Sequence, residues 1–196
     1  MKISVITPTW QRHSDLLNRC IPSVLAQDYP DTEHIIVSDG DEPGLYPALL
    51  ERYGPEIAAG RIRYGTMHDH DPSRRWGHRA RLAGIEMARA DVIAWLDDDN
   101  SWRPHHLTVL AAALEANPAA GFAYSQIQVN TSVVGDGQPR HGQIDTSVMI
   151  CRTSALAAAT WRDDGQQTVD WDLAERWIAA GVGWVFVPQV TADWRM

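Results

Sequence analysis

The chain has 196 residues, 44% of them hydrophobic, and a formal net charge of −8 at pH 7. This length and composition fit one compact domain with an ordinary core, and they exclude a fibre or a disordered chain. The 25 acidic residues outnumber the 17 basic ones, so we expect no sequence-independent binding of nucleic acid.

The first half of the chain alternates short β-branched segments with segments of helical periodicity. Strands are predicted at 3–7, 34–38, 61–64 and 91–96, and helices at 14–25, 45–52, 79–89 and 104–115. Pro22 should kink or split the first helix. The alternation predicts an α/β fold with a mostly parallel central sheet flanked by helices. Ligands of such sheets bind beyond the carboxyl ends of the strands.

Beyond Gly121 the pattern changes. Strands are predicted at 121–129 and 146–151, on either side of a polar, glycine-rich segment at 130–143. This arrangement predicts a small antiparallel excursion with a mobile tip in the C-terminal half. A helix over 170–180 and a strand over 184–187 follow. Because no repeat or linker divides the chain, we predict a single domain over 1–196.

Three consecutive carboxylates, Asp97, Asp98 and Asp99, follow the strand at 91–96. Neighbouring carboxylates cannot all ionise cheaply without a counter-ion, and their hard oxygen ligands suit Mg²⁺ or Mn²⁺ better than zinc. A bound diphosphate would complete the coordination of such a metal. Side chains alternate along a strand, so Asp97 and Asp99 should face one way and Asp98 the other. The alternative is a solvated turn that caps the next helix.

Two further acidic positions are candidates for binding or catalysis. Asp39 follows the strand at 34–38, where a carboxylate could accept a hydrogen bond from the ring N–H of a nucleobase; the alternative is an ordinary turn residue. Asp170 and Asp172 point roughly 200° apart on a helix, so at most one of them faces a given site. With an ordinary pKa, Asp170 would be ionised at pH 7 and could act as a general base toward a hydroxyl. The alternative is that either aspartate simply caps the helix.

Basic and aromatic residues give weaker signals. Guanidinium groups can donate two hydrogen bonds to phosphate oxygens. The candidates for diphosphate contact are therefore Arg12, Arg74, Arg75 and Arg81. A solvated loop is the alternative for Arg74 and Arg75. We expect Trp95 and Trp177 in the core. Trp102 and Trp171 could contact a sugar, with a core position as the alternative. Four histidines lack the spacing of a zinc site, namely His68, His70, His105 and His106.

No apolar run reaches the roughly 18 residues of a membrane helix, so no transmembrane segment is expected. Cys20 and Cys151 lie in apolar segments without metal-ligand spacing. We therefore expect a cytoplasmic protein with reduced cysteines. A peripheral position at the inner face of a membrane stays open.

Three segments in order resemble the family 2 glycosyltransferases, which have the GT-A fold. They are "ISVITPTWQR" with "HIIVSDGDEPG", then "ARLAGIEMARADVIAWLDDDNSWRPHHL", and last "VDWDLAERWIAAG". The resemblance implies transfer of a sugar from a nucleotide-diphosphate sugar to an acceptor hydroxyl, with inversion and with Mn²⁺ or Mg²⁺. It further implies a nucleotide-sugar-binding half at 1–100 and an acceptor and base half at 101–196.

The resemblance also implies roles for individual residues. Asp170 becomes the catalytic base, and Asp99 with Asp97 becomes the metal site. Nucleotide contacts are expected from Thr7, Pro8, Thr9, Arg12, Asp39, Arg81, Asp97 and Asp98. The chain departs from the family pattern at Gln11, at Leu82 and at Val169, where an acidic partner usually precedes the base.

Two other functions fit part of the pattern. A noncatalytic nucleotide-sugar-binding module would explain Val169 as a trace of a lost base site. A nucleotidyltransferase is an enzyme on a related sheet, but it would usually show a glycine-rich basic loop after the first strand. The segment "TPTWQR" has no such loop.

Overall fold

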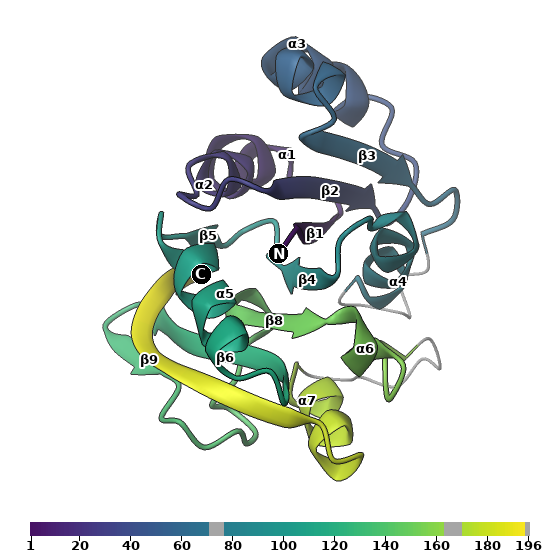
Figure 1. Ribbon diagram of the computed structural model, residues 1–196. Coiled ribbons are helices and arrows are strands. Elements are labelled where there is room, and N and C mark those ends of the chain that lie inside the picture. The colour runs from purple at the N-terminus through teal and green to yellow at the C-terminus, as the bar shows by residue number, and fades with distance from the viewer. Residues whose placement is uncertain (71–76, 163–169, 195–196) are drawn as a thin grey trace.

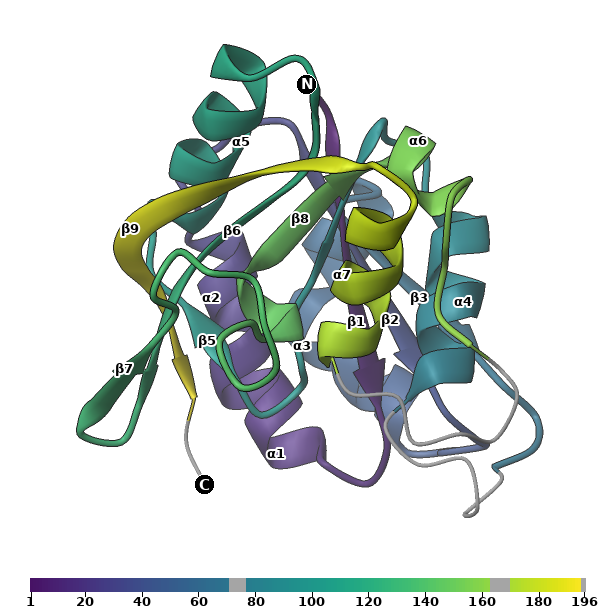
Figure 2. The same cartoon turned by 90° about the horizontal axis from the view of Figure 1, so that it is seen from below.

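The computed structural model describes residues 1–70, 77–162 and 170–194. Its strands form one mixed sheet in the order β3-β2-β1-β4-β8-β6-β9-β5, with β7 paired to β6. The strands are β1 (Ile3–Thr9), β2 (Thr32–Ser38), β3 (Ile62–Thr66), β4 (Val92–Trp95), β5 (Ser101–Trp102), β6 (Ala120–Val129), β7 (Ser132–Val134), β8 (Met149–Arg152) and β9 (Gly183–Trp194). Helices flank both faces of this sheet (Figures 1 and 2).

The helical segments are α1 (His13–Asp15), η1 (Leu16–Cys20), α2 (Ile21–Leu25), α3 (Leu45–Ala58), α4 (His78–Met87), α5 (His106–Ala116), η2 (Thr146–Val148), α6 (Thr153–Leu156) and α7 (Asp170–Ala179). Among the described residues, none of these helices is both long and apolar enough to span a membrane.

The predicted α/β fold is confirmed. Strands β1, β2, β3 and β4 run parallel, and β8 joins β4 in the antiparallel direction. The antiparallel part lies in the C-terminal half as expected, where β6 pairs with β7 and β8. Asn130 has a left-handed φ of 52° in the tight turn between β6 and β7, a conformation that asparagine adopts more readily than most residues.

The core has two layers, one on each face of the sheet. Leu16, Leu49 and Leu110 from the helices α3 and α5 and the turn η1 pack against one face. Trp177 of α7 packs with Trp95 of β4 on the other face, and both rings are fully buried, which confirms the predicted core positions of these two tryptophans. Residues buried on both faces explain the nearly continuous apolar character of the central strands.

Proline accounts for the main differences from the predicted boundaries. The first helix is split as expected. Pro22 lies in the first turn of α2, and a π-helical turn, η1, precedes that helix. Helix α3 continues past its predicted end through a kink at Tyr53 and contains Pro55. Strand β9 is longer than predicted, and its register against β6 shifts between Phe186 and Val190, where a bulge accommodates the proline between them.

Candidate active site

Three loops meet at the carboxyl ends of β1, β2 and β4. The register of the parallel strands places Thr9 opposite Ser38, and the backbone N–H of Asp39 donates to the carbonyl of Thr9 at 2.9 Å. On the other side of β1, the N–H of Leu96 donates to the carbonyl of Ile6 at 3.1 Å. Strand pairing therefore brings the segments after Thr9, Asp39 and Leu96 to one edge of the sheet, as their positions in the sequence predict.

The acidic segment after β4 has two cationic partners from different parts of the chain. Arg81 of α4 is buried and forms an ion pair with Oδ1 of Asp97. Arg12, in the loop after β1, pairs with Asp99 and lies 3.8 Å from Asp98. The structure thus places both arginines, which were predicted to contact a diphosphate, against the acidic segment itself.

The three aspartates differ in burial. Asp98 turns inward, while the side chains of Asp97 and Asp99 keep 32% and 23% of their surface exposed. Burial, with the charge of Asp97 as a further cause, raises the pKa of Asp98 to about 6. Only Asp97 and Asp99 are therefore placed to offer oxygens to a ligand outside the protein.

These carboxylates fit a hard divalent cation. Among the described residues, no group of three or more His, Cys, Asp or Glu side chains is arranged to hold a metal ion. A metal here would take one or two protein carboxylates and complete its shell with water and phosphate oxygens, which is the usual arrangement for Mg²⁺. Asp97 and Asp99 supply that donor set.

Arg81 has a second contact that the sequence did not point to. Its guanidinium lies over the ring of Trp161, 4.9 Å from the ring centroid. Trp161 is buried, makes an edge contact with Trp95 and stacks on His78. The indole ring of Trp161, from the C-terminal half, thus restricts the position of Arg81 beside the acidic segment.

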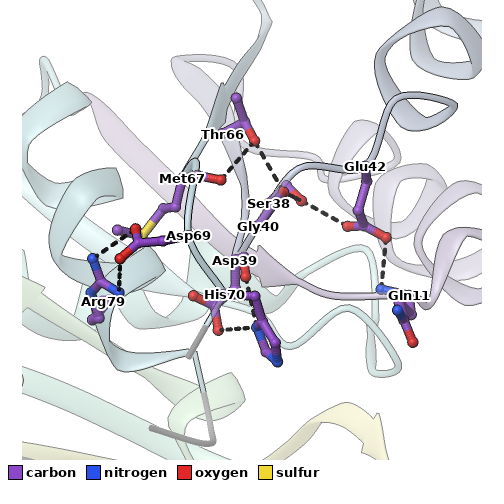
Figure 3. Close-up of polar contacts among 10 residues, drawn as sticks. All are labelled: Gln11, Ser38, Asp39, Gly40, Glu42, Thr66, Met67, Asp69, His70 and Arg79. Atoms are coloured by element: carbon purple, nitrogen blue, oxygen red, sulfur yellow. Dashed lines mark hydrogen bonds and ion pairs between the residues drawn. The ribbon is translucent and has the colours of Figure 1, made fainter. Parts of the chain in front are cut away.

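Asp39 lies beside a stacked pair of rings. His70 places Nδ1 at 2.8 Å from the carbonyl oxygen of Asp39 and 3.5 Å from its carboxylate (Figure 3). The ring of His70 stacks on Trp10 with centroids 4.1 Å apart. Burial raises the pKa of Asp39, and the neighbouring charge of His70 opposes this effect. Gly40 has φ +150°, and a Cβ there would lie 2.3 Å from the Trp10 ring, so only glycine fits.

The hydroxyl of Thr7 points into the protein. It lies 2.8 Å from Nε2 of His34 and 3.6 Å from the sulfur of Cys20, and all three residues are buried. Cys20 and Cys151 are free thiols in the core. Any contact of Thr7 with a nucleotide must therefore come from its backbone.

Asp170 begins α7 and meets the turn at residues 145–147. The hydroxyl of the buried Thr146 donates a hydrogen bond to Oδ1 of Asp170. Burial raises the pKa of Asp170, the charge of Asp97 raises it further, and Arg81 lowers it. The next residue of the turn, Ser147, accepts a hydrogen bond from the backbone N–H of Asp97 at 3.4 Å, so one turn contacts both Asp170 and the acidic segment after β4.

The other acidic residue of this helix has a different partner. Asp172 pairs with Arg176 at 2.8 Å on the same helix and lies 3.8 Å from Arg162. Asp170 and Asp172 thus have separate partners, as helical geometry predicts. Val169, Arg74 and Arg75 lie outside the described residues.

Several other candidate residues belong to the protein interior. Trp102 is buried, donates from Nε1 to the carbonyl of Ser147 at 2.6 Å and stacks on His106, so the core alternative holds for this tryptophan. His106 is itself buried beside Thr191. Trp171 is partly buried against the core layer of α7.

The fold is that of the GT-A glycosyltransferases. TarS of S. aureus in complex with UDP-GlcNAc matches it with a TM-score of 0.78 at 14% identity, over 98% of this chain and 58% of that chain. A mannosyltransferase from Pyrobaculum calidifontis, in complex with GDP-Man and Mn²⁺, matches with a TM-score of 0.75 at 16% identity, over 98% of this chain and 56% of that chain.

Sequence comparison gives the family. The model of glycosyl transferase family 2 matches residues 4–176, and the chain therefore belongs to this family, as the three segments predicted. WcaA of Escherichia coli, a glycosyl transferase named for colanic acid biosynthesis, is 32% identical over 123 residues. That match covers 63% of this chain and 41% of WcaA, so the chain spans less than half the length of this relative.

Proposed function

We propose that this domain transfers a sugar from a nucleotide-diphosphate sugar to an acceptor hydroxyl, with inversion and with a divalent metal. One observation carries the proposal most directly: adjacent residues of the turn at 145–147 hydrogen-bond the candidate base and the acidic segment, since Thr146 donates to Asp170 and Oγ of Ser147 accepts from the backbone N–H of Asp97 at 3.4 Å. A base and a diphosphate site that are joined by one short turn could act on the two sides of one sugar. The family membership and the fold support the same reaction class.

The donor would bind over the three loops. In this proposal Asp39 accepts a hydrogen bond from the base, and Thr7, Pro8 and Thr9 line the nucleotide through their backbone. Arg12 and Arg81 would exchange part of their ion pairing with the acidic segment for contacts to the diphosphate. A guanidinium group can donate two parallel hydrogen bonds to phosphate oxygens.

Asp97 and Asp99 are the proposed metal ligands, with Mn²⁺ or Mg²⁺ as the ion. When bound, the metal supplies positive charge that stabilises the leaving diphosphate. The presence of Mn²⁺ in the complex of the P. calidifontis mannosyltransferase supports this assignment.

Asp170 would act on the other side of the sugar. Its carboxylate takes the proton of the acceptor hydroxyl as the oxygen of that hydroxyl bonds to the anomeric carbon. The bond from that carbon to the diphosphate oxygen breaks on the opposite face, and the diphosphate leaves with the bonding electron pair. Attack and departure on opposite faces give inversion.

We further propose that residues 1–100 supply the donor contacts and residues 101–196 the base and the acceptor contacts, within a single catalytic domain. UDP-GlcNAc in TarS and GDP-Man in the mannosyltransferase support a nucleotide-sugar donor as a class. A cytoplasmic location remains a prediction.

Two measurements test the proposal. Thermal shifts against UDP-, GDP- and dTDP-sugars, with Mn²⁺ and with EDTA, should identify a nucleotide that stabilises the protein only with metal. Donor hydrolysis or transfer should then fall roughly 10²–10⁴-fold in Asp170→Asn, with little change in donor affinity. Metal-dependent binding without turnover in the unmodified protein would favour a noncatalytic binding module.

A further inference from the structure

The turn at Asp145–Ser147 joins the two parts of the candidate active site. Thr146, at its centre, donates a hydrogen bond to Oδ1 of Asp170. The next hydroxyl, Oγ of Ser147, accepts a hydrogen bond at 2.8 Å from Nδ2 of Asn100, which follows the acidic residues. Adjacent hydroxyls of one short turn therefore contact the candidate base on one side and the acidic segment on the other.

The turn is held firmly enough to position a side chain. The carboxylate of Asp145 accepts from the backbone N–H of Ser147 at 2.7 Å, and Trp102 donates to the carbonyl of Ser147. Strand β8 follows immediately and pairs with both β4 and β6. Thr146 is also β-branched and fully buried, so its χ1 angle has little freedom.

We propose that Thr146 is a positioning residue for Asp170. Its hydroxyl holds Oδ1 of the carboxylate, its backbone N–H adds a second hydrogen bond, and the oriented carboxylate receives the proton of the acceptor hydroxyl. A fixed carboxylate has less orientational freedom to lose when the acceptor binds, which lowers the barrier to proton transfer. This inference rests on the proposed role of Asp170 as the base.

The hydrogen bond should also keep Asp170 ionised. Burial and the charge of Asp97 favour the protonated acid, whereas Thr146 and Arg81 favour the carboxylate. A second buried carboxyl group, Asp145, has its pKa raised by burial and by the charges of Asp170 and Asp97. Two such groups compete for protons, and a hydroxyl donated to Asp170 favours ionisation of that member of the pair.

The test compares Thr146→Val, which removes the hydroxyl at nearly constant volume, with Thr146→Ser, which keeps it. The titration of the Asp170 carboxyl is followed by ¹³C NMR, with the signal assigned by its loss in Asp170→Asn. We expect the titration to move up by about one pH unit or more in Thr146→Val and to stay near the unmodified value in Thr146→Ser.

The same variants are assayed for hydrolysis of UDP-GlcNAc and GDP-Man with Mn²⁺ as a function of pH. Thr146→Val should lower the turnover number at pH 7 by roughly 10-fold or more, with unchanged donor affinity, because the lost bond is to a charged group. Raising the pH should restore part of that turnover. Melting curves check that each variant is folded, and Thr146→Ala replaces the valine variant if that one is not.

Ser147→Ala is the matched control, since it removes the neighbouring hydroxyl of the same turn. It should alter metal-dependent nucleotide affinity through Asn100. The Ser147 hydroxyl also hydrogen-bonds Asp145, which competes with Asp170 for protons, so we expect the titration of Asp170 to move much less than in Thr146→Val. An unchanged titration in Thr146→Val would overturn the positioning role, whether or not a donor is hydrolysed. Undiminished turnover in Asp170→Asn would instead overturn the proposed base.

Discussion

The carboxylate of Glu42 accepts a hydrogen bond at 2.8 Å from the backbone N–H of Gln11, and this contact fixes the loop after β1 to the loop after β2 (Figure 3). The same side chain accepts from the hydroxyl of Ser38 at 2.7 Å and lies 2.8 Å from Nε2 of His13. One nearly buried carboxylate thus sets the spacing of two of the three loops that form the candidate nucleotide site.

Glu42→Ala should therefore lower the free energy of unfolding by about 1–3 kcal/mol, because it removes the acceptor of the Gln11 N–H and the partner of His13, and leaves the Ser38 hydroxyl with the carbonyl of Gly40 alone. Urea denaturation of the nucleotide-free protein measures the change. Asp41→Ala is the control: that side chain is 61% exposed and its pairing with His68 is at the surface, so its removal should cost about 0.5 kcal/mol or less. Equal losses in the two variants would contradict the role given to Glu42.

Gln11 itself has a left-handed φ of 56°, which costs free energy for any residue with a Cβ. Gln11→Gly should raise the free energy of unfolding by about 0.5–1 kcal/mol while keeping the backbone bond to Glu42. Gln11→Asn should raise it less, since asparagine tolerates this conformation better than glutamine. Gln11→Val tests the argument from the opposite direction, and a valine variant as stable as the unmodified protein would contradict it.

The different burial of the three aspartates gives a ranking for metal binding. Asp99→Ala should weaken Mn²⁺-dependent binding of UDP or GDP more than Asp98→Asn, because Asp98 is turned inward. Calorimetric titration of the nucleotide with Mn²⁺ and with EDTA measures both effects. The reverse ranking, or equal affinity with and without EDTA in the unmodified protein, would refute the metal assignment.

Trp161 should matter for the diphosphate although it lies outside the acidic segment. Trp161→Leu removes the ring beneath Arg81, and we expect the affinity for UDP or GDP to fall roughly 3- to 30-fold, the range of a cation–π contact that is partly desolvated. Trp161→Phe keeps a ring face and should lose less. Trp184→Leu, at a tryptophan that is 37% exposed, is the control and should bind as the unmodified protein does.

His34 makes the stability of the protein depend on pH. Complete burial lowers its pKa to about 3, below the value near 6.5 expected in the unfolded chain. The unfolded state therefore binds one proton more between these two values, so His34 removes stability as the pH falls below 6.5. The loss amounts to about 2 kcal/mol at pH 5. Buried carboxyl groups with raised pKa values contribute with the opposite sign, which makes a difference measurement necessary.

His34→Gln isolates that contribution. The free energy of unfolding of the variant should vary less steeply between pH 7 and pH 5 than that of the unmodified protein, with a difference in slope that grows as the pH falls and approaches about one proton near pH 5. Parallel curves for the two proteins would show that His34 already titrates normally in the folded state.

The convergence of the three loops could be predicted from the sequence because it depends on a local signal. Each buried strand ends at a polar segment, and parallel strands in adjacent positions bring such segments to one edge. Asp39 and Asp97 were placed in this way, whereas Arg12 and Arg81 were proposed separately, from the affinity of guanidinium groups for phosphate. Asp98 is more buried than its two neighbours, as predicted, but the strand on which that prediction relied ends at Trp95, and the turn that follows sets the orientation of Asp98.

Thr146 and Trp161 could not be found by the same reasoning. Thr146 contacts Asp170 across 24 residues, and Arg81 and Trp161 are 80 positions apart. Such pairs form only when the antiparallel strand β8 and the segments around it are in place, and no periodicity marks them. Trp102 shows the converse: its position beside the acidic residues suggested a sugar contact, but pairing of β5 with β9 places its ring in the core.

Strand β4 is hydrogen-bonded along both edges, to β1 of the N-terminal half and to β8 of the C-terminal half. A fragment of residues 1–100 would leave the β8 side of this strand open, with Val92, Ile93 and Ala94 on an exposed apolar edge prone to aggregation. The proposed donor-binding and base-bearing parts are therefore not interchangeable modules. Chimeras that join the first half of one family member to the second half of another must preserve the pairing of β4 with β8 in order to fold.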